Sequence, residues 1–67
     1  MSVVKIVQII GQSPNSFDEA VKSAVETTSK SVRNVKSFQV DEMSGEVGAD
    51  GKVVNYRVSV KIAFVVE

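Results

Sequence analysis

The stretch Val54–Val66, with the sequence VNYRVSVKIAFVV, decides the fold of this chain. Every even-numbered position in it is apolar, whereas the odd-numbered positions between them are mostly polar: Asn55, Arg57, Ser59 and Lys61. This alternation predicts a β-strand with one dry face and one wetter face. A strand of about 14 residues, at ~3.3 Å per residue, is roughly 46 Å long. Its dry face needs a cover of similar length.

One helix is predicted, over residues 17–33, and it is too short to provide that cover. At 1.5 Å per residue it is about 25 Å long, roughly half the length of the strand. Its apolar residues recur at spacings of three and four and form one stripe: Phe17, Ala20, Val21, Ala24, Val25, Thr28 and Val32. We therefore expect another copy of the chain to cover the rest of the dry face.

The two ends of this helix carry recognisable signals. Ser16-Phe17-Asp18-Glu19 fits a capping box, in which Ser16 accepts from the backbone N–H of Glu19 and the Glu19 side chain accepts from the N–H of Ser16. Asn34 is expected to leave the helix in the left-handed conformation.

Two further strands are predicted, at residues 3–10 and residues 36–46. Gly11 is expected to end the first of them. In the second, the alternation slips at Met43, which predicts a bulge or strong bend near Met43 or Gly45.

These elements predict a single α+β domain, spanning residues 1–67, with the order β-α-β-β. Asp50-Gly51 marks a hairpin turn before the last strand. A right-handed crossover makes the first two strands parallel, and the long strand fits between them, antiparallel to both, in the order 1-3-2. The face away from the helix is polar and could line a shared pocket or an interface: Ser37, Gln39, Asp41, Asn55, Arg57, Ser59 and Lys61.

Composition excludes several classes of function. The 67 residues include 8 Lys and Arg and 8 Asp and Glu, so the basic excess typical of nucleic-acid binders is missing. There is no Cys and no His, which excludes disulfides, thiolate or imidazole metal sites and Ser-His-Asp catalysis. No apolar run approaches the ~20 residues of a membrane span. We expect a cytoplasmic, non-enzymatic protein, stabilised by oligomerisation because its core is small.

A loose group of acidic residues leaves two interpretations open: Asp41, Glu42, Glu46 and Asp50. They do not follow the D-x-D-x-D-G pattern of a calcium loop. They are either solvated carboxylates or ligands of a divalent ion shared across a symmetry axis.

Three segments resemble the dodecin family. They are GQSPNSFDEAV at 11–21, SVRNV at 31–35 leading into Phe38-Gln39-Val40, and GKVVNYRVSVKIAF at 51–64. The resemblance covers essentially the whole chain. It implies a three-stranded antiparallel sheet partly wrapped around one helix, and a hollow homododecamer. It also implies flavins bound in pairs between subunits for storage or sequestration, without turnover.

At the two positions that contact the flavin ring in that family, this chain carries different residues. Ser37 stands where the family has a stacking tryptophan, and Arg57 where it has a hydrogen-bonding glutamine. Stacking on a ligand ring contributes about 1 kcal/mol beyond area burial, and serine has no ring. Arginine donates but cannot accept hydrogen bonds, and its charge could favour an anionic ligand such as the phosphate of FMN. Glu42 aligns with an acidic position near the flavin site.

Two hypotheses follow. The leading one is a homododecamer that binds FMN or riboflavin between subunits, near Ser37, Gln39, Glu42 and Arg57. The alternative is a shell of the same fold that has lost flavin binding and holds ions or another small ligand.

Overall fold

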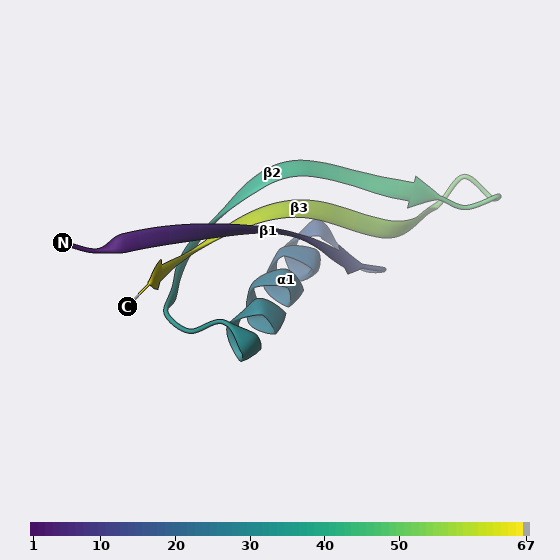
Figure 1. Cartoon of the computed structure of the whole chain (residues 1–67). Coiled ribbons are helices and arrows are strands. Elements are labelled where there is room, and N and C mark those ends of the chain that lie inside the picture. Colours follow the sequence, from purple (N-terminus) through teal and green to yellow (C-terminus); the bar gives the residue numbers. More distant parts are fainter. Residues whose placement is uncertain (67) are drawn as a thin grey trace.

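The computed structural model describes residues 1–66 and contains one helix and one three-stranded sheet (Figure 1). The elements are β1 (Val3–Ser13), α1 (Phe17–Ser31), β2 (Val35–Val47) and β3 (Val53–Val66). β3 lies between β1 and β2 and is antiparallel to both. Figure 1 shows α1 packed across one face of the sheet. The predicted α+β fold, the β-α-β-β order and the strand order 1-3-2 are confirmed.

β1 continues past Gly11, contrary to the prediction that this glycine ends the strand. Gly11 pairs with Val58, and the ladder with β3 runs on to Ser13. The glycine is needed for a different reason, the close approach of α1. A Cβ on Gly11 would lie 2.3 Å from the carbonyl oxygen of Ala20 and 2.9 Å from the Cβ of Ala24. Gly11 therefore marks the point where the helix crosses the strand.

Only one of the two hydrogen bonds of the predicted capping box forms at the N-terminus of α1. The Ser16 hydroxyl accepts from the Glu19 N–H at 3.0 Å. The Glu19 carboxylate does not reach back to Ser16, because it accepts from Ser13 Oγ at 2.9 Å and Asn15 Nδ2 at 2.8 Å. The Ser13 hydroxyl itself accepts from the N–H groups of Asn15 and Ser16. Ser13 occupies this place because β1 is longer than predicted.

The hydrogen bond from Asn15, and secondarily that from Ser13, lowers the pKa of Glu19. A carboxyl whose pKa is lowered by folding stabilises the protein above its unfolded-state pKa of about 4.3, and that contribution disappears as pH falls through the folded-state pKa. We expect the stability difference between the wild type and Glu19→Gln to shrink between about pH 7 and about pH 3. Thermal unfolding at fixed protein concentration measures it. A difference that stays constant over this range contradicts the assignment.

α1 ends at Ser31, two residues before the predicted end. Val32 has extended dihedral angles, although its N–H still donates to the Thr28 carbonyl at 2.9 Å. Asn34 has φ 61° and so adopts the predicted left-handed conformation, but in the connection to β2 and not at the helix end. Its carbonyl accepts from the Val65 N–H at 3.1 Å, which attaches this connection to β3.

The core is small and lies between α1 and the middle of β3. Its buried apolar residues come from the predicted stripe and from the dry face of the long strand: Ala20, Ala24, Val58, Val60 and Ile62. Phe17 packs edge-on against Tyr56 with ring centroids 5.0 Å apart. The alanines let the helix lie close to β1 and β3, and it therefore leaves β2 largely uncovered.

The helix-facing side of β2 and the β2–β3 hairpin are apolar and exposed. Phe38 is 52% exposed, Met43 57% and Val47 68%. Val54 and Val66, at the two ends of β3, are exposed as well. Figure 1 shows the hairpin extending well past α1. The dry face does outrun the helix, as predicted, but β2 is exposed even more than β3.

The pairing of β2 with β3 is irregular at three places, between Val35 and Ser37, between Val40 and Glu42 and between Glu46 and Val47, and not at the predicted Met43 or Gly45 themselves. Val40 pairs with Val60 and Glu42 with Ser59, so one extra residue, Asp41, is accommodated between them. This bulge returns Met43 to the helix-facing side, which explains the slip in the sequence pattern. The predicted turn at Asp50-Gly51 is confirmed, since Gly51 has φ 81° and Asp50 Oδ1 accepts from the Lys52 N–H at 3.1 Å.

Candidate functional site

The candidate site is the face of the sheet that points away from α1, called the outer face below. Residues that pair directly across neighbouring strands share a face, so the register defines rows of three side chains. From the hairpin side to the chain termini the rows are Gln12–Arg57–Ser44, Ile10–Ser59–Glu42, Gln8–Lys61–Gln39 and Ile6–Ala63–Ser37. All four sequence-predicted candidates lie in these rows: Ser37, Gln39, Glu42 and Arg57.

Within one protomer, however, the structure does not bring Ser37 and Arg57 together. Ser37, on β2, pairs with Ala63 on β3, and Arg57 lies on β3 six positions before Ala63. At ~3.3 Å per residue the two candidates are roughly 20 Å apart. A site that uses both side chains needs two copies of the chain.

Arg57 is held by a network across all three strands, called the arginine cluster below. Its Nη2 forms an ion pair with Glu46 Oε1. Its Nε and Nη2 also donate to Gln12 Oε1 at 3.3 Å and 3.2 Å. Asn55 Nδ2 donates to the same Gln12 oxygen at 2.9 Å and to Glu46 Oε1 at 3.3 Å. From the sequence, the charge of Arg57 was expected to favour a ligand phosphate. In the structure this charge is paired with Glu46 within the protomer.

Sequence reasoning missed Gln12 and Glu46 as partners of Arg57. Gln12 lies outside the predicted first strand, because Gly11 is expected to end that strand. A strand continued to residue 13 sets Gln12 directly opposite Arg57. Both residues are visible in the sequence, but their pairing with Arg57 can be recognised only once the register of the sheet is known.

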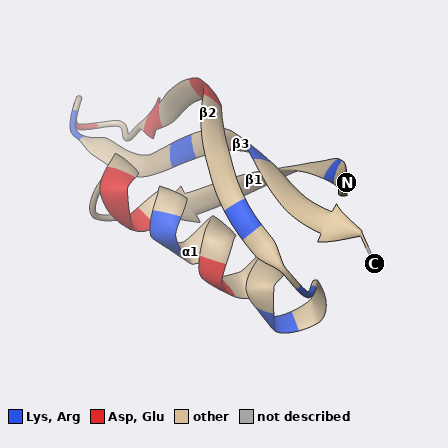
Figure 2. Cartoon of the chain, turned by 90° about the vertical axis from the view of Figure 1, so that its left-hand side faces the viewer, with Lys and Arg blue, Asp and Glu red and all other residues tan. Residues whose placement is uncertain are grey.

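A second polar network lies farther along the outer face. Gln8 Nε2 donates to Asp41 Oδ2 at 3.1 Å and to Ser59 Oγ at 2.9 Å. Lys61 Nζ lies 3.8 Å from Asp41 Oδ1. Asp41 therefore keeps its carboxylate on the outer face despite the bulge. Figure 2 shows that the acidic positions of β2 lie in the second half of this strand. Glu42 is exposed and belongs to neither network.

The outer face becomes apolar beyond Lys61, around Ser37. Ile6 and Val4 are exposed there and pair with Ala63 and Val65. Ile6, Ala63 and Ser37 lie abreast, and at ~4.8 Å between strands the row is about 10 Å wide. The short side chains of Ala63 and Ser37 leave it open for a flat ligand.

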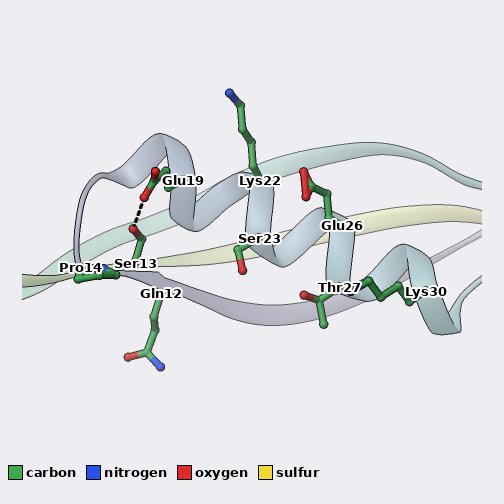
Figure 3. A pocket seen from close by; sticks show the side chains of 9 residues that line it. All are labelled: Gln12, Ser13, Pro14, Glu19, Lys22, Ser23, Glu26, Thr27 and Lys30. Carbon is green, nitrogen blue, oxygen red and sulfur yellow. Dashed lines mark hydrogen bonds between the residues drawn. The ribbon is translucent and has the colours of Figure 1, made fainter.

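A separate polar groove runs between α1 and the end of β1 (Figure 3). Glu19 and Ser13 close one end of it, and the Lys22 side chain points away from the sheet. None of the four candidates lines it. Among residues 1–66, no group of three or more Asp or Glu side chains is placed to hold a metal ion. In the same part of the chain, no helix is long and apolar enough to cross a membrane.

The chain is similar to proteins of one family. Residues 3–67 match the family model described as Dodecin. The chain is 36% identical over 64 residues to calcium dodecin of Mycobacterium tuberculosis, covering 96% of this chain and 89% of that protein. It is 31% identical over 65 residues to the dodecin of Thermus thermophilus, covering 97% and 93%.

Solved structures agree with these matches. A crystal structure of a T. thermophilus dodecin mutant superposes with a TM-score of 0.93 at 30% identity, covering 100% of this chain and 98% of that one. The crystal structure of the M. tuberculosis calcium dodecin, described as having a novel calcium-binding site, superposes with a TM-score of 0.84 at 33% identity. That match covers 98% of this chain and 93% of the other.

Proposed function

The chain belongs to the dodecin family, and on that premise we propose that it is a homododecameric protein that binds and sequesters a flavin, FMN or riboflavin. In this proposal each chain is one domain, residues 1–67, and the ligand lies on the outer face between subunits. Binding needs enclosure, stacking and hydrogen bonds but no proton transfer, so no catalytic residue is assigned.

Exposed apolar surface supports the assembly. Val21, Val25 and Phe38 line an apolar groove between α1 and β2. A second groove, between α1 and the hairpin, is lined by Phe17, Tyr56 and Val47, among others. Covering a large apolar side chain fully contributes about 1.5–3 kcal/mol. Monomeric proteins rarely leave such patches uncovered, and another copy of the chain is the cover that the family supplies.

The observation that supports the ligand proposal is the change from apolar to polar side chains along the outer face. The row Ile6–Ala63–Ser37 is a flat apolar strip, whereas the rows toward the hairpin offer hydrogen-bond donors and acceptors. A flavin has a planar ring system with a polar edge, and it matches both parts. Because the strip and the arginine cluster are far apart in one protomer, two copies must contribute.

Restoring a ring at position 37 is expected to raise flavin affinity. A stacked indole contributes about 1 kcal/mol, which corresponds to roughly fivefold tighter binding of riboflavin by Ser37→Trp. Quenching of riboflavin and FMN fluorescence, titrated with protein, measures it. Ser29→Trp places the same ring on an exposed helix position and serves as the control. Absence of quenching by both the wild type and Ser37→Trp contradicts the flavin proposal.

Glu42 favours one alternative function, a shell that holds a divalent ion. Its carboxylate is exposed beside Asp41, and a relative of this chain is named for calcium. Because one protomer does not gather three acidic side chains among its described residues, the ion would be shared around a symmetry axis. Calcium titration by calorimetry tests this. Calcium binding that is lost in Glu42→Gln, together with no flavin quenching, favours the alternative over the flavin proposal.

A further inference from the structure

The ionisable side chains of the arginine cluster, of the network around Asp41 and of the neighbouring Glu42 carry a net negative charge. Three of them are acidic and two are basic: Asp41, Glu42, Glu46, Arg57 and Lys61. Both basic groups are paired within the protomer, Arg57 with Glu46 and Lys61 with Asp41. The third acid, Glu42, brings the sum to one negative charge per protomer. A site shared by two copies doubles this charge.

The arginine cluster leaves donors for an uncharged ligand. Gln12 Oε1 and Glu46 Oε1 take the hydrogen bonds of Nε and Nη2 of Arg57. Nη1 of Arg57 and the amide nitrogen of Gln12 remain as donors. Carbonyl oxygens on the edge of a planar ring can accept from both. A phosphate gains less here, because the Glu46 carboxylate already neutralises the guanidinium and repels a second anion.

We propose, on the basis of the flavin function above, that Glu46 sets the ligand preference of this face. The preferred ligand is an uncharged flavin, riboflavin, and the phosphate-bearing FMN is discriminated against. Glu46 acts by compensating Arg57, so its removal releases a cation for the phosphate.

The test compares dissociation constants of riboflavin and FMN, from fluorescence quenching, for the wild type and Glu46→Gln. The wild type is expected to bind riboflavin at least about threefold more tightly than FMN. Glu46→Gln is expected to bind FMN about fivefold more tightly than the wild type does, with riboflavin changed less than about twofold. The gain should fade when salt rises from about 0.05 M to about 0.5 M.

Two further variants make the test specific. Asp50→Asn removes the same charge at the exposed hairpin turn, where the asparagine Oδ1 can still accept from the Lys52 N–H, and it should leave both constants as in the wild type. Arg57→Gln leaves Glu46 uncompensated, and it should shift the preference further toward riboflavin. The two opposite shifts, in Glu46→Gln and Arg57→Gln, cannot both arise from a general loss of structure.

The outcomes separate this inference from the function on which it rests. If the wild type binds neither flavin, the proposed function fails and the preference fails with it. If both flavins bind but FMN binds more tightly to the wild type, only the preference is overturned. The preference is also overturned if the ratio of the FMN and riboflavin dissociation constants is the same in Glu46→Gln as in the wild type.

Discussion

Replacing Gly11 by alanine is expected to destabilise the protomer by about 1–3 kcal/mol, a large share of the ~3–5 kcal/mol that a core of this size supplies. The added Cβ meets the carbonyl oxygen of Ala20 at 2.3 Å, and this atom belongs to the helix backbone and cannot rotate away. The helix must move off β1, which opens the packing of Ala24 on the sheet. Chemical unfolding followed by circular dichroism, at fixed protein concentration, measures the loss.

Gly51→Asn provides the control for this prediction. A Cβ on Gly51 meets nothing within 4 Å, and asparagine tolerates its positive φ of 81°. This variant should change stability by less than about 0.5 kcal/mol. If Gly11→Ala is equally mild, the helix does not depend on this contact with the strand.

Replacing Phe38 by glutamate is expected to break the assembly. Phe38 is half exposed in the protomer, where a surface substitution changes stability by about 0.5 kcal/mol or less. If a neighbouring copy covers it, the same change buries an unpaired carboxylate, which costs several kcal/mol. The two situations therefore predict different outcomes for one variant. Size-exclusion chromatography should show only small species, whether folded or unfolded.

Phe38→Leu is the matched control, because it keeps most of the apolar surface and adds no charge. It should elute with the wild type. A Phe38→Glu protein that also elutes at the wild-type volume contradicts the assignment of this groove to a subunit contact.

Local patterns were sufficient to predict the elements. The alternation in Val54–Val66 and the spacing of apolar residues in the helix each depend on a repeat visible in the sequence. Both correspond to the observed β3 and α1 within two residues at each end. Strand order followed from the handedness of the crossover.

Contacts between segments that are distant in the sequence could not be predicted in the same way. Gly11 looked like a strand terminator, because nothing in the local sequence reveals that a helix crosses above it. The pairing of Arg57 with Gln12 and Glu46, and its separation from Ser37, depend on the register of three strands. The bulge at Asp41 shifts that register by one residue. The sequence therefore identified the face of the candidate site but not the partners of its side chains.

The central claim is that this protomer leaves apolar surface that only further copies of the chain can cover. Native mass spectrometry of the protein as isolated tests it most directly. The expected result is one closed species of twelve times 7.2 kDa, about 86 kDa, with any flavin retained as added mass. A stable, folded 7.2 kDa monomer in dilute solution contradicts the claim, and the shared ligand site between subunits is lost with it.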